Sequence, residues 1–336
     1  MRAWCVVVPQ EEGEAIRRRL QDDGVLLRHL RIRAEDGRLL LPTARRVDLG
    51  FPTKEADFEE GFAPVRSYKD VVRVPEALRP FLPRAFDVIG EIAVLKIPED
   101  LEAHRAEIGR AILAWNPRLR VVAQDRGVMG DRRVRRIEVV AGEDRTTTVH
   151  VEFGLRYHVD VARAYFSPRL GTERRRIADL VTPGEIIVDP FAGVGPYAIL
   201  IARRSRAERV VASDANPDAV ALLRTNVAAN RAERVEVRLG DARDVLRVVA
   251  PVDRVVLDLP HDAMRFLPDA LRVLRPRGTV HVYGIVERAE VDDRTQLIRR
   301  AAEREGRRVE ALGVHTVRAY SPTQHHAAFD VTVVPM

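Results

Sequence analysis

Residues 188–202 read VDPFAGVGPYAILIA, and this stretch decides the fold. A β-branched run ends at Asp189, a turn with Gly193 and Gly195 follows, and a helix of small residues begins after it. With Ala198 the two glycines satisfy the pattern G-x-G-x-x-G/A, whose glycines let backbone N–H groups approach a ligand closely. The stretch therefore predicts a strand, a ligand-binding turn and a helix, although a purely structural turn can have the same pattern.

Helix and strand patterns alternate around this turn from about residue 160 onward. The predicted helices include RRRIADLV, PDAVALLRTNVAAN and DAMRFLPDALRVL, and the predicted strands include EIIVD, RVVASD, VEVRLGD, VDRVVLDLP and GTVHVYGIV. Repeated strand–helix units of this length predict an α/β, Rossmann-like fold with a doubly wound, mostly parallel sheet. Sheets of this kind bind ligands at the carboxyl ends of their strands.

Two smaller α/β units are predicted before this one. Residues 1–60 combine a strand (WCVVVP), a helix (EEGEAIRRRLQDDG) and a hairpin that turns at the DG of LRIRAEDGRLLLP. Residues 61–70, GFAPVRSYKD, read as a linker. Residues 71–159 contain two short strands in AFDVIGEIAVLKIP, a helix over EDLEAHRAEIGRAILAW and three further strands. Residues 160–336 then form the third unit.

The composition is that of a globular protein, with 336 residues and a hydrophobic fraction of 46%. The single Cys5 excludes an internal disulfide framework and a thiolate metal cluster. The early apolar run WCVVV is too short to span a bilayer and lacks a signal-peptide layout, so we expect a cytoplasmic protein. His325 and His326 lie in a strand-like run and are interpreted as structural residues rather than metal ligands.

The positive charge is concentrated in one region. The formal net charge is +6, and only Lys54, Lys69 and Lys96 are lysines, so the remaining basic residues are arginines. Residues 115–180 contain 14 Arg and 9 Asp plus Glu, a net charge of +5. This concentration favours a phosphate-bearing partner, although arginines also cover ordinary solvated faces.

Acidic residues after the predicted strands distinguish between two nucleoside cofactors. Asp214 ends the strand after the glycine turn, where a carboxylate bonds ribose hydroxyls. Asp189 would repel the pyrophosphate of NAD but would attract the sulfonium and ammonium groups of S-adenosylmethionine. Asp241, in LGDARD, is placed to bond an adenine amino group, and LDLP, with Asp258 and Pro260, follows the fourth strand. Many methyltransferases carry an Asn/Asp-Pro element there, so the sequence favours S-adenosylmethionine, with a dehydrogenase as the remote alternative.

Two stretches, VDVARAYFSPRLGTERRRI and VDPFAGVGPY, are specific enough to suggest a family. In them the chain resembles the archaeal and eukaryotic tRNA (guanine-37-N1)-methyltransferases, and YFSPRL followed by ER is absent from generic methyltransferases. The resemblance covers the whole chain, including the C-terminal VRAYSPTQHHAAFDV. It implies a monomer that transfers methyl from S-adenosylmethionine to N1 of guanosine 37, beside the anticodon. It also implies that the second and third units hold the anticodon arm and that the first unit touches the outer corner of the tRNA.

The resemblance implies roles for three residues. Glu173 matches the proposed general base for the N1 proton, although by position alone it is a helix-start or ion-pair residue. Arg133 matches an arginine that stabilises negative charge on guanine O6, although it is also one arginine of a basic run. Tyr165 is expected to pack on the cofactor or the target base, with a place in the core as the alternative.

The remaining expectations concern the cofactor and the rival activities. The residues expected to bind the cofactor are Tyr165, Arg174, Asp189, Phe191, Gly193, Gly195, Asp214, Ala215, Asp241, Ala242, Asp258 and Pro260. The family usually has Asn where this chain has Asp258, and an ionised Asp only accepts hydrogen bonds, which leaves its contacts open. The rivals are a wyosine-pathway enzyme at the same nucleotide, either a bifunctional methyltransferase or an aminocarboxypropyl transferase, and a non-catalytic tRNA-binding module.

Overall fold

The computed structural model describes residues 1–61, 67–129, 134–249 and 251–336. The chain divides into two compact units, Met1–Val72 and Arg73–Met336. The boundary between the units lies next to the linker predicted at 61–70, and a further division at residue 159 stays a prediction. Within the described ranges, every helix is too short or too polar to span a bilayer.

The first unit is a four-stranded sheet with one α-helix. Its strands lie in the order β2-β3-β1-β4, with β1 at Arg2–Pro9, β2 at Arg33–Glu35, β3 at Arg38–Thr43 and β4 at Thr53–Asp57, and its helix is α1, Gly13–Asp22. The β2–β3 hairpin turns through Asp36 (φ +48°) and Gly37 (φ +72°), which confirms the predicted DG turn. Leu20 of α1 packs on Val6, Val8 and Leu41 in one hydrophobic cluster of this unit, and Cys5, Val7, Leu30, Leu40 and Phe58 form another.

The second unit begins with a mixed sheet and a hairpin. The sheet has the order β5-β6-β7-β8, with β5 at Asp87–Ile89, β6 at Ile92–Leu95, β7 at Val121–Met129 and β8 at Val134–Gly142. Helix α2, Arg105–Trp115, makes the crossover between the parallel strands β6 and β7, and a 3-10 turn, η4 (Glu99–His104), precedes it. The hairpin pairs β9, Thr147–Glu152, with β10, Leu155–Asp160.

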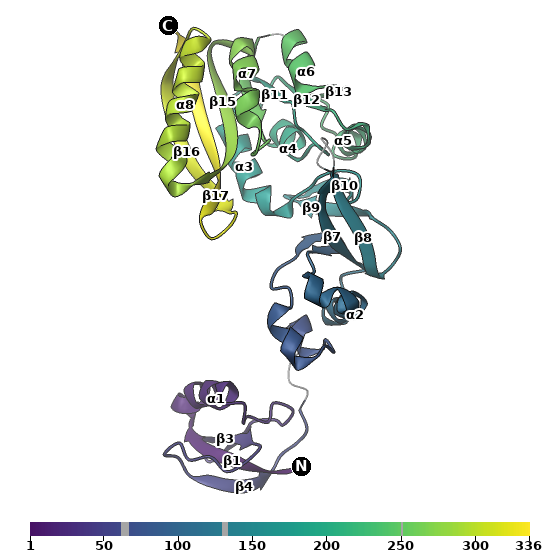
Figure 1. The fold of residues 1–336 in the computed structure, drawn as a ribbon, viewed down its shortest axis with the longest axis vertical. Helices are drawn as coiled ribbons and strands as arrows, with labels where there is room; N and C mark the ends of the chain where they lie inside the picture. Colours follow the sequence, from purple (N-terminus) through teal and green to yellow (C-terminus); the bar gives the residue numbers. More distant parts are fainter. Residues whose placement is uncertain (62–66, 130–133, 250) are drawn as a thin grey trace. The chain divides into compact units, whose positions relative to one another are not determined.

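A seven-stranded sheet forms the centre of the second unit (Figure 1). Its order is β13-β12-β11-β14-β15-β17-β16, with β11 at Ile186–Asp189, β12 at Arg209–Asp214, β13 at Val235–Leu239, β14 at Val252–Leu257, β15 at Leu274–Glu287, β16 at Arg307–Ala319 and β17 at Gln324–Pro335. The first five strands in this order are parallel, and β17 runs antiparallel to both of its neighbours, β15 and β16. The predicted α/β, mostly parallel sheet is confirmed.

Helices cover both faces of this sheet. They are α3 (Gly171–Leu180), α4 (Pro196–Arg204), α5 (Pro217–Ala229), α6 (Ala242–Val248), α7 (Leu267–Val273) and α8 (Val291–Arg304). Neighbouring strand residues point to opposite faces, so Ile187 joins the core with α3, α4 and α5, and Val188 joins the core with α6, α7 and α8. The first of these cores also contains Ile92, Val121 and Tyr157 of the preceding strands. The preceding strands and the central sheet therefore share one hydrophobic core.

Two asparagines at the end of α5 bind the edge of β10 that β9 leaves free. Asn230 accepts from the backbone N–H of Arg156 (2.9 Å) and donates to its carbonyl (2.7 Å). Asn226 does the same at His158, with distances of 2.6 and 3.0 Å. Four helical residues rise about 6 Å and two strand residues about 6.6 Å, so the two amides match the spacing of the strand.

Candidate active site

Four aspartates lie at the carboxyl ends of four adjacent parallel strands. Asp189 ends β11, Asp214 ends β12, Asp241 follows β13 and Asp258 follows β14. The chain order reverses between β11 and β14, which is the switch point where such sheets bind ligands. The structure therefore brings together the four acidic residues that were predicted from separate stretches of sequence.

Three of these carboxyl groups have raised pKa values. Burial raises the pKa of Asp189 well above its usual range, and the negative charges of Asp258 and Asp214 raise it further. Burial also raises the pKa of Asp214, against the opposing effect of backbone N–H donors such as that of Gly193. The pKa of Asp258 is raised to about 6, by burial and by the charge of Glu173, while Arg174 opposes the rise. The site thus favours a cationic ligand, which would stabilise the ionised carboxylates.

The carboxylate of Asp189 is buried and incompletely hydrogen-bonded. It is 1% exposed, its Oδ1 accepts from the Phe191 N–H at 3.4 Å, and its Oδ2 has no partner among the described residues. A buried carboxylate oxygen without a donor is costly. An ammonium or sulfonium group at this place would offset that cost, which fits S-adenosylmethionine.

The glycine turn has backbone conformations with positive φ, which residues other than glycine rarely adopt. Gly193 has φ +54° and its N–H donates to Asp214 Oδ2 at 2.9 Å, which ties the turn to the end of β12. Gly195 has φ +91°, and a Cβ there would collide with the side chain of Leu223 on α5. The turn therefore requires glycine at both places, as a close approach of backbone to ligand does.

The remaining residues expected at the cofactor line the same edge of the sheet. Asp241 is the N-cap of α6 and accepts from the Arg243 N–H at 2.8 Å, which commits one of its oxygens. Ala242 is buried beside it and Ala215, after β12, is exposed. Phe191 packs edge-on against Phe266 at 4.9 Å between ring centroids. The carbonyl of Pro260, two residues after Asp258, accepts from the Ile285 N–H at 3.3 Å.

Glu173 lies in the first turn of α3, as predicted, and is 5% exposed. Its Oε1 accepts from the Tyr283 hydroxyl (2.7 Å) and from Arg176 Nη2 (2.7 Å), and its Oε2 accepts from Arg176 Nε (2.8 Å). Tyr197 donates in turn to the Tyr283 hydroxyl at 3.2 Å. Burial raises the pKa of both tyrosines well above the usual range, so both hydroxyls stay protonated. Glu173 is therefore an ion-pair residue in the structure, and its role as general base stays a prediction.

Arg174 is buried beneath the site and is 2% exposed. It donates to Glu152 Oε2 at 2.8 Å and to the Ser167 carbonyl at 2.7 Å, and its guanidinium lies over the Phe166 ring at 4.9 Å. Its Nε has no partner among the described residues. Nη1 and Nη2 thus hold the SPRL turn on the β9–β10 hairpin, and Nε is left for another group.

Tyr165 is 47% exposed, so the alternative that places it in the core is wrong. The guanidinium of Arg135 lies over its ring at 5.0 Å. An exposed aromatic ring with an arginine on one face can stack a nucleobase. Arg133 lies outside the described residues.

Sequence reasoning missed the partners of Glu173. Tyr283 is 110 residues away along the chain and Tyr197 is in α4, so no local pattern connects them to α3. The available signal was the interruption of the apolar strand GTVHVYGIV by polar side chains, which predicts buried partners without identifying them.

His325 and His326 lie in β17, as predicted. His326 is 2% exposed and its ring packs at 5.5 Å from that of Tyr283, and burial lowers its pKa to about 4. Its two ring nitrogens have no partner among the described residues. In the described part of the chain, no group of three His, Cys, Asp or Glu side chains is arranged to hold a metal ion.

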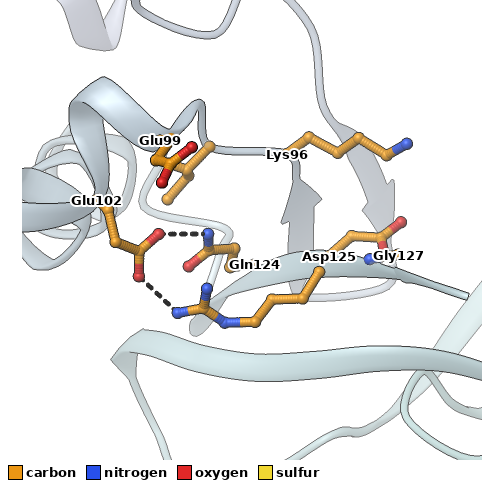
Figure 2. Close-up of a pocket in the computed structure, with 8 residues that line it drawn as sticks. Lys96, Glu99, Glu102, Gln124, Asp125 and Gly127 are labelled. Atoms are coloured by element: carbon orange, nitrogen blue, oxygen red, sulfur yellow. Dashed lines mark hydrogen bonds and ion pairs between the residues drawn. The ribbon is translucent and has the colours of Figure 1, made fainter. Parts of the chain in front are cut away.

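A separate pocket of about 490 Å³ lies beside η4 and β7 (Figure 2). It is lined by Lys96, Ile97, Glu99, Glu102, Gln124, Asp125, Arg126 and Gly127. Glu102 accepts from Gln124 Nε2 at 2.9 Å, as Figure 2 shows, and it also accepts from Arg126 Nη2 at 2.5 Å. None of the residues expected at the cofactor lines this pocket, so it is distinct from the aspartate site.

Comparisons with known proteins cover the chain from end to end. It matches the family described as TRM5/TYW2 methyltransferase domain over residues 148–310. The tRNA methyltransferase 5 N-terminal domain matches residues 5–48, and the TYW2 N-terminal domain matches residues 69–146. The match to the methyltransferase domain begins at residue 148, within the range that was predicted for the second unit, and the predicted boundary at residue 159 stays a prediction.

Two solved structures resemble the whole chain. The tRNA (guanine(37)-N(1))-methyltransferase Trm5b of Pyrococcus abyssi is 39% identical over 331 residues, which are 98% of each chain. Its crystal structure has a TM-score of 0.77 and covers 99% of each chain. A complex of aTrm5 and tRNALeu has a TM-score of 0.71 at 30% identity, covering 98% of this chain and 99% of the other.

Proposed function

The chain belongs to the TRM5/TYW2 methyltransferase family, and we propose that it transfers methyl from S-adenosylmethionine to N1 of guanosine 37 in tRNA. The observation that carries this proposal is the set of four carboxylates at the switch point of the sheet, where Asp189 is buried and one of its oxygens has no partner among the described residues. The matched relatives support the substrate: one is named for this reaction, and another was solved with tRNALeu.

The residues that hold the cofactor would be those at the carboxyl edge of the sheet. Asp214 is placed to bond ribose hydroxyls, Asp241 to accept from an adenine amino group, and Asp189 to meet a cationic group of the donor. When bound, S-adenosylmethionine supplies an electrophilic methyl carbon and keeps the electron pair of the broken C–S bond on sulfur. Gly193 and Gly195 would let the turn keep the left-handed backbone conformations with which it approaches the donor.

Methylation of the target guanine needs a general base, because N1 of guanine carries a proton at neutral pH. Glu173 Oε2 would accept this proton while the N1 lone pair forms the bond to the methyl carbon. Negative charge builds on O6 as the proton leaves, and Arg133 would stabilise it, by resemblance to the family. Tyr165 would stack the base after it leaves the anticodon loop.

The tRNA would contact more than the catalytic site. Residues 71–159 and 160–336 would hold the anticodon arm, in keeping with the net charge of +5 over residues 115–180. The first unit would touch the outer corner of the tRNA. A monomeric state and a cytoplasmic location stay predictions from the sequence.

The test is incubation with methyl-labelled S-adenosylmethionine and unmodified tRNA, followed by nucleoside analysis. We expect labelled 1-methylguanosine, and no product from a tRNA with adenosine at position 37. A parallel reaction uses S-adenosylmethionine labelled in the aminocarboxypropyl group and tRNA that carries 4-demethylwyosine at position 37, the substrate for which one relative is named. An aminocarboxypropyl nucleoside there, without 1-methylguanosine in the first reaction, would overturn the proposal in favour of the wyosine-pathway rival. No modified nucleoside with either label would identify a non-catalytic tRNA-binding module.

A further inference from the structure

A chain of hydrogen-bonded charged and polar side chains leads from Glu173 across the sheet. Its members are Glu173 and Arg176 of α3, Asp330 of β17, His281 of β15, Arg254 of β14, and Glu185, which directly precedes β11. None of these residues other than Glu173 was expected at the active site. Of the two partners of Arg176, Glu173 is three residues away on the same helix, whereas Asp330 is 154 residues away in sequence.

Arg176 is placed between two carboxylates. Its Nε and Nη2 donate to the two oxygens of Glu173, and its Nη1 and Nη2 donate to Asp330 at 2.5 and 3.2 Å. A guanidinium that makes paired hydrogen bonds on both sides can hold both carboxylates in one plane and one orientation. The position of Glu173 therefore depends on the position of Asp330.

Asp330 is fixed in turn by a histidine of known tautomer. His281 Nδ1 lies 2.6 Å from Asp330 Oδ1, and its Nε2 lies 2.7 Å from Arg254 Nη1. Because an arginine can only donate, Nε2 must accept, so the proton of the neutral ring is on Nδ1 and is donated to Asp330. Burial lowers the pKa of His281, against the opposing effect of Asp330, in agreement with a neutral ring.

At its far end, this series of hydrogen bonds is held in place by the contacts of Arg254. Arg254 donates through Nε and Nη2 to both oxygens of Glu185, at 2.7 and 3.0 Å. It also donates to the carbonyl of Leu180, the last residue of α3, at 3.1 Å. The chain of contacts thus begins in the first turn of α3 and returns to its end.

Such a chain is not explained by stability alone. Replacing buried ion pairs by apolar residues is often neutral or stabilising, whereas removing one partner is costly. The hydrogen bonds instead have a geometric consequence at Glu173. Each carboxylate oxygen has two acceptor positions, and among the described residues both of those on Oε1 and one on Oε2 are filled. One position on Oε2 is left for an incoming proton.

We propose that Arg176 is a positioning residue that, held by Asp330 and His281, directs the remaining acceptor position of Glu173 Oε2 toward the target base. This inference rests on the proposed role of Glu173 as general base. It predicts that loss of Arg176 slows proton transfer while the binding of cofactor and tRNA is retained, because a reacting group displaced by about 1 Å can lose about 10²-fold in rate.

The first test compares Arg176→Gln with Arg272→Gln in the full chain. Arg272 makes the same paired bonds to a glutamate, Glu305, at 2.8 and 2.7 Å, but lies on the surface between α7 and α8. We expect Arg176→Gln to lower the single-turnover rate at saturating tRNA and cofactor by about 10²-fold, with near-native affinities, and Arg272→Gln to leave the rate unchanged. Arg176→Lys should recover only part of the rate, since an ammonium cannot make both pairs. A native rate for Arg176→Gln would overturn the proposal.

A double variant separates positioning from a structural role. If Arg176 acts through Glu173, the variant Glu173→Gln/Arg176→Gln should be no slower than Glu173→Gln alone. Multiplied losses would show that Arg176 acts elsewhere, and would overturn the inference. A native rate for Glu173→Gln itself would instead remove Glu173 from the proposed function.

Asp330→Asn keeps the test decisive if Arg176→Gln does not fold. The amide that replaces the carboxylate would accept from Arg176 through one oxygen only, so we expect a smaller loss of rate than with Arg176→Gln and again no further loss when Glu173→Gln is added. A native rate for Asp330→Asn would show that the contact between Asp330 and Arg176 does not position Glu173, and would overturn that part of the inference.

Discussion

At the scale of the residue, Glu173 retains one acceptor position on Oε2 and is otherwise held by Arg176 and Tyr283. Gln at this position keeps the shape but cannot accept a proton at neutral pH. We expect Glu173→Gln to lower the single-turnover rate of methyl transfer by about 10²–10⁴-fold, with near-native affinities for tRNA and cofactor. If Glu173 is only structural, the melting temperature falls and the rate stays normal.

Asp258 gives the site a dependence on pH. Its pKa is raised to about 6, so the group is neutral below that pH and negatively charged above it. The donor is a cation, so its affinity should increase as the pH rises from about 5 to about 7.5, and calorimetry at several pH values would measure this. Asp258→Asn should make the increase shallower, with Asp189 and Asp214 contributing the remainder.

A matched ligand is the control for this prediction. S-adenosylhomocysteine lacks the sulfonium charge, so its affinity should change less over the same pH range. An affinity for S-adenosylmethionine that does not change with pH would contradict the raised pKa of Asp258.

The sequence predicted the acidic residues of the site better than their partners. Asp189, Asp214, Asp241 and Asp258 each follow a recognisable strand, and parallel strands bring their carboxyl ends together. The contacts of Arg176 could not be predicted in this way, because they depend on which strand residues face α3 in the folded chain. A charged residue such as Asp330 in an apolar strand indicates a buried partner but does not identify it.

At the scale of the element, the strand–turn–helix unit depends on the backbone of Gly195. An alanine there would have φ +91° and would collide with Leu223. We expect Gly195→Ala to lower the free energy of unfolding by at least about 1–3 kcal/mol and to weaken cofactor binding. Chemical denaturation and calorimetry would measure the two effects.

Gly184→Ala is the matched control for this turn. Gly184 has φ +84°, but a Cβ there meets nothing within 4 Å, and it lies before β11. Gly184→Ala should lower the free energy of unfolding through the same kind of backbone strain and should leave the cofactor affinity unchanged. Equal cofactor affinities for the two variants would show that the Gly195 turn is not part of the binding site.

Elements with strong periodicity or turn signals were predicted, and others were missed. The DG hairpin of the first unit and the strands that flank the glycine turn were predicted because their signals are local. Helices α6 and α8 were not predicted. Helix α6 has only seven residues, Ala242–Val248, and its start depends on the cap that Asp241 provides.

At the scale of the whole molecule, the division into two units predicts what can be removed. We expect residues 73–336 alone to fold and to bind S-adenosylmethionine with native affinity, because the core and the aspartate site lie within that range. Its affinity for tRNA should be weaker, if the first unit touches the outer corner. Calorimetry and tRNA-binding assays on the truncated protein would measure both, and loss of cofactor binding would show that the first unit supports the fold.

A shorter fragment tests the boundary that was predicted at residue 159. A chain of residues 160–336 would lose Ile92, Val121 and Tyr157 from the core that backs the central sheet. We expect this fragment to be unstable to thermal unfolding although it contains every strand of that sheet, because each large core side chain lost costs about 2–5 kcal/mol. A cooperative transition at the melting temperature of the 73–336 protein would show that residues 160–336 fold independently of residues 73–159.

The two asparagines at the end of α5 also have a consequence for the behaviour of the protein in concentrated solution. An unpaired strand edge is a template on which a strand of another molecule can add, and β10 would present such an edge if its N–H and C=O groups were free. Asn226 and Asn230 occupy these groups with side-chain amides, which cannot propagate a sheet. The helix thereby protects the hairpin against intermolecular β-pairing, and loss of the Asn230 amide would expose the protein to aggregation through β10.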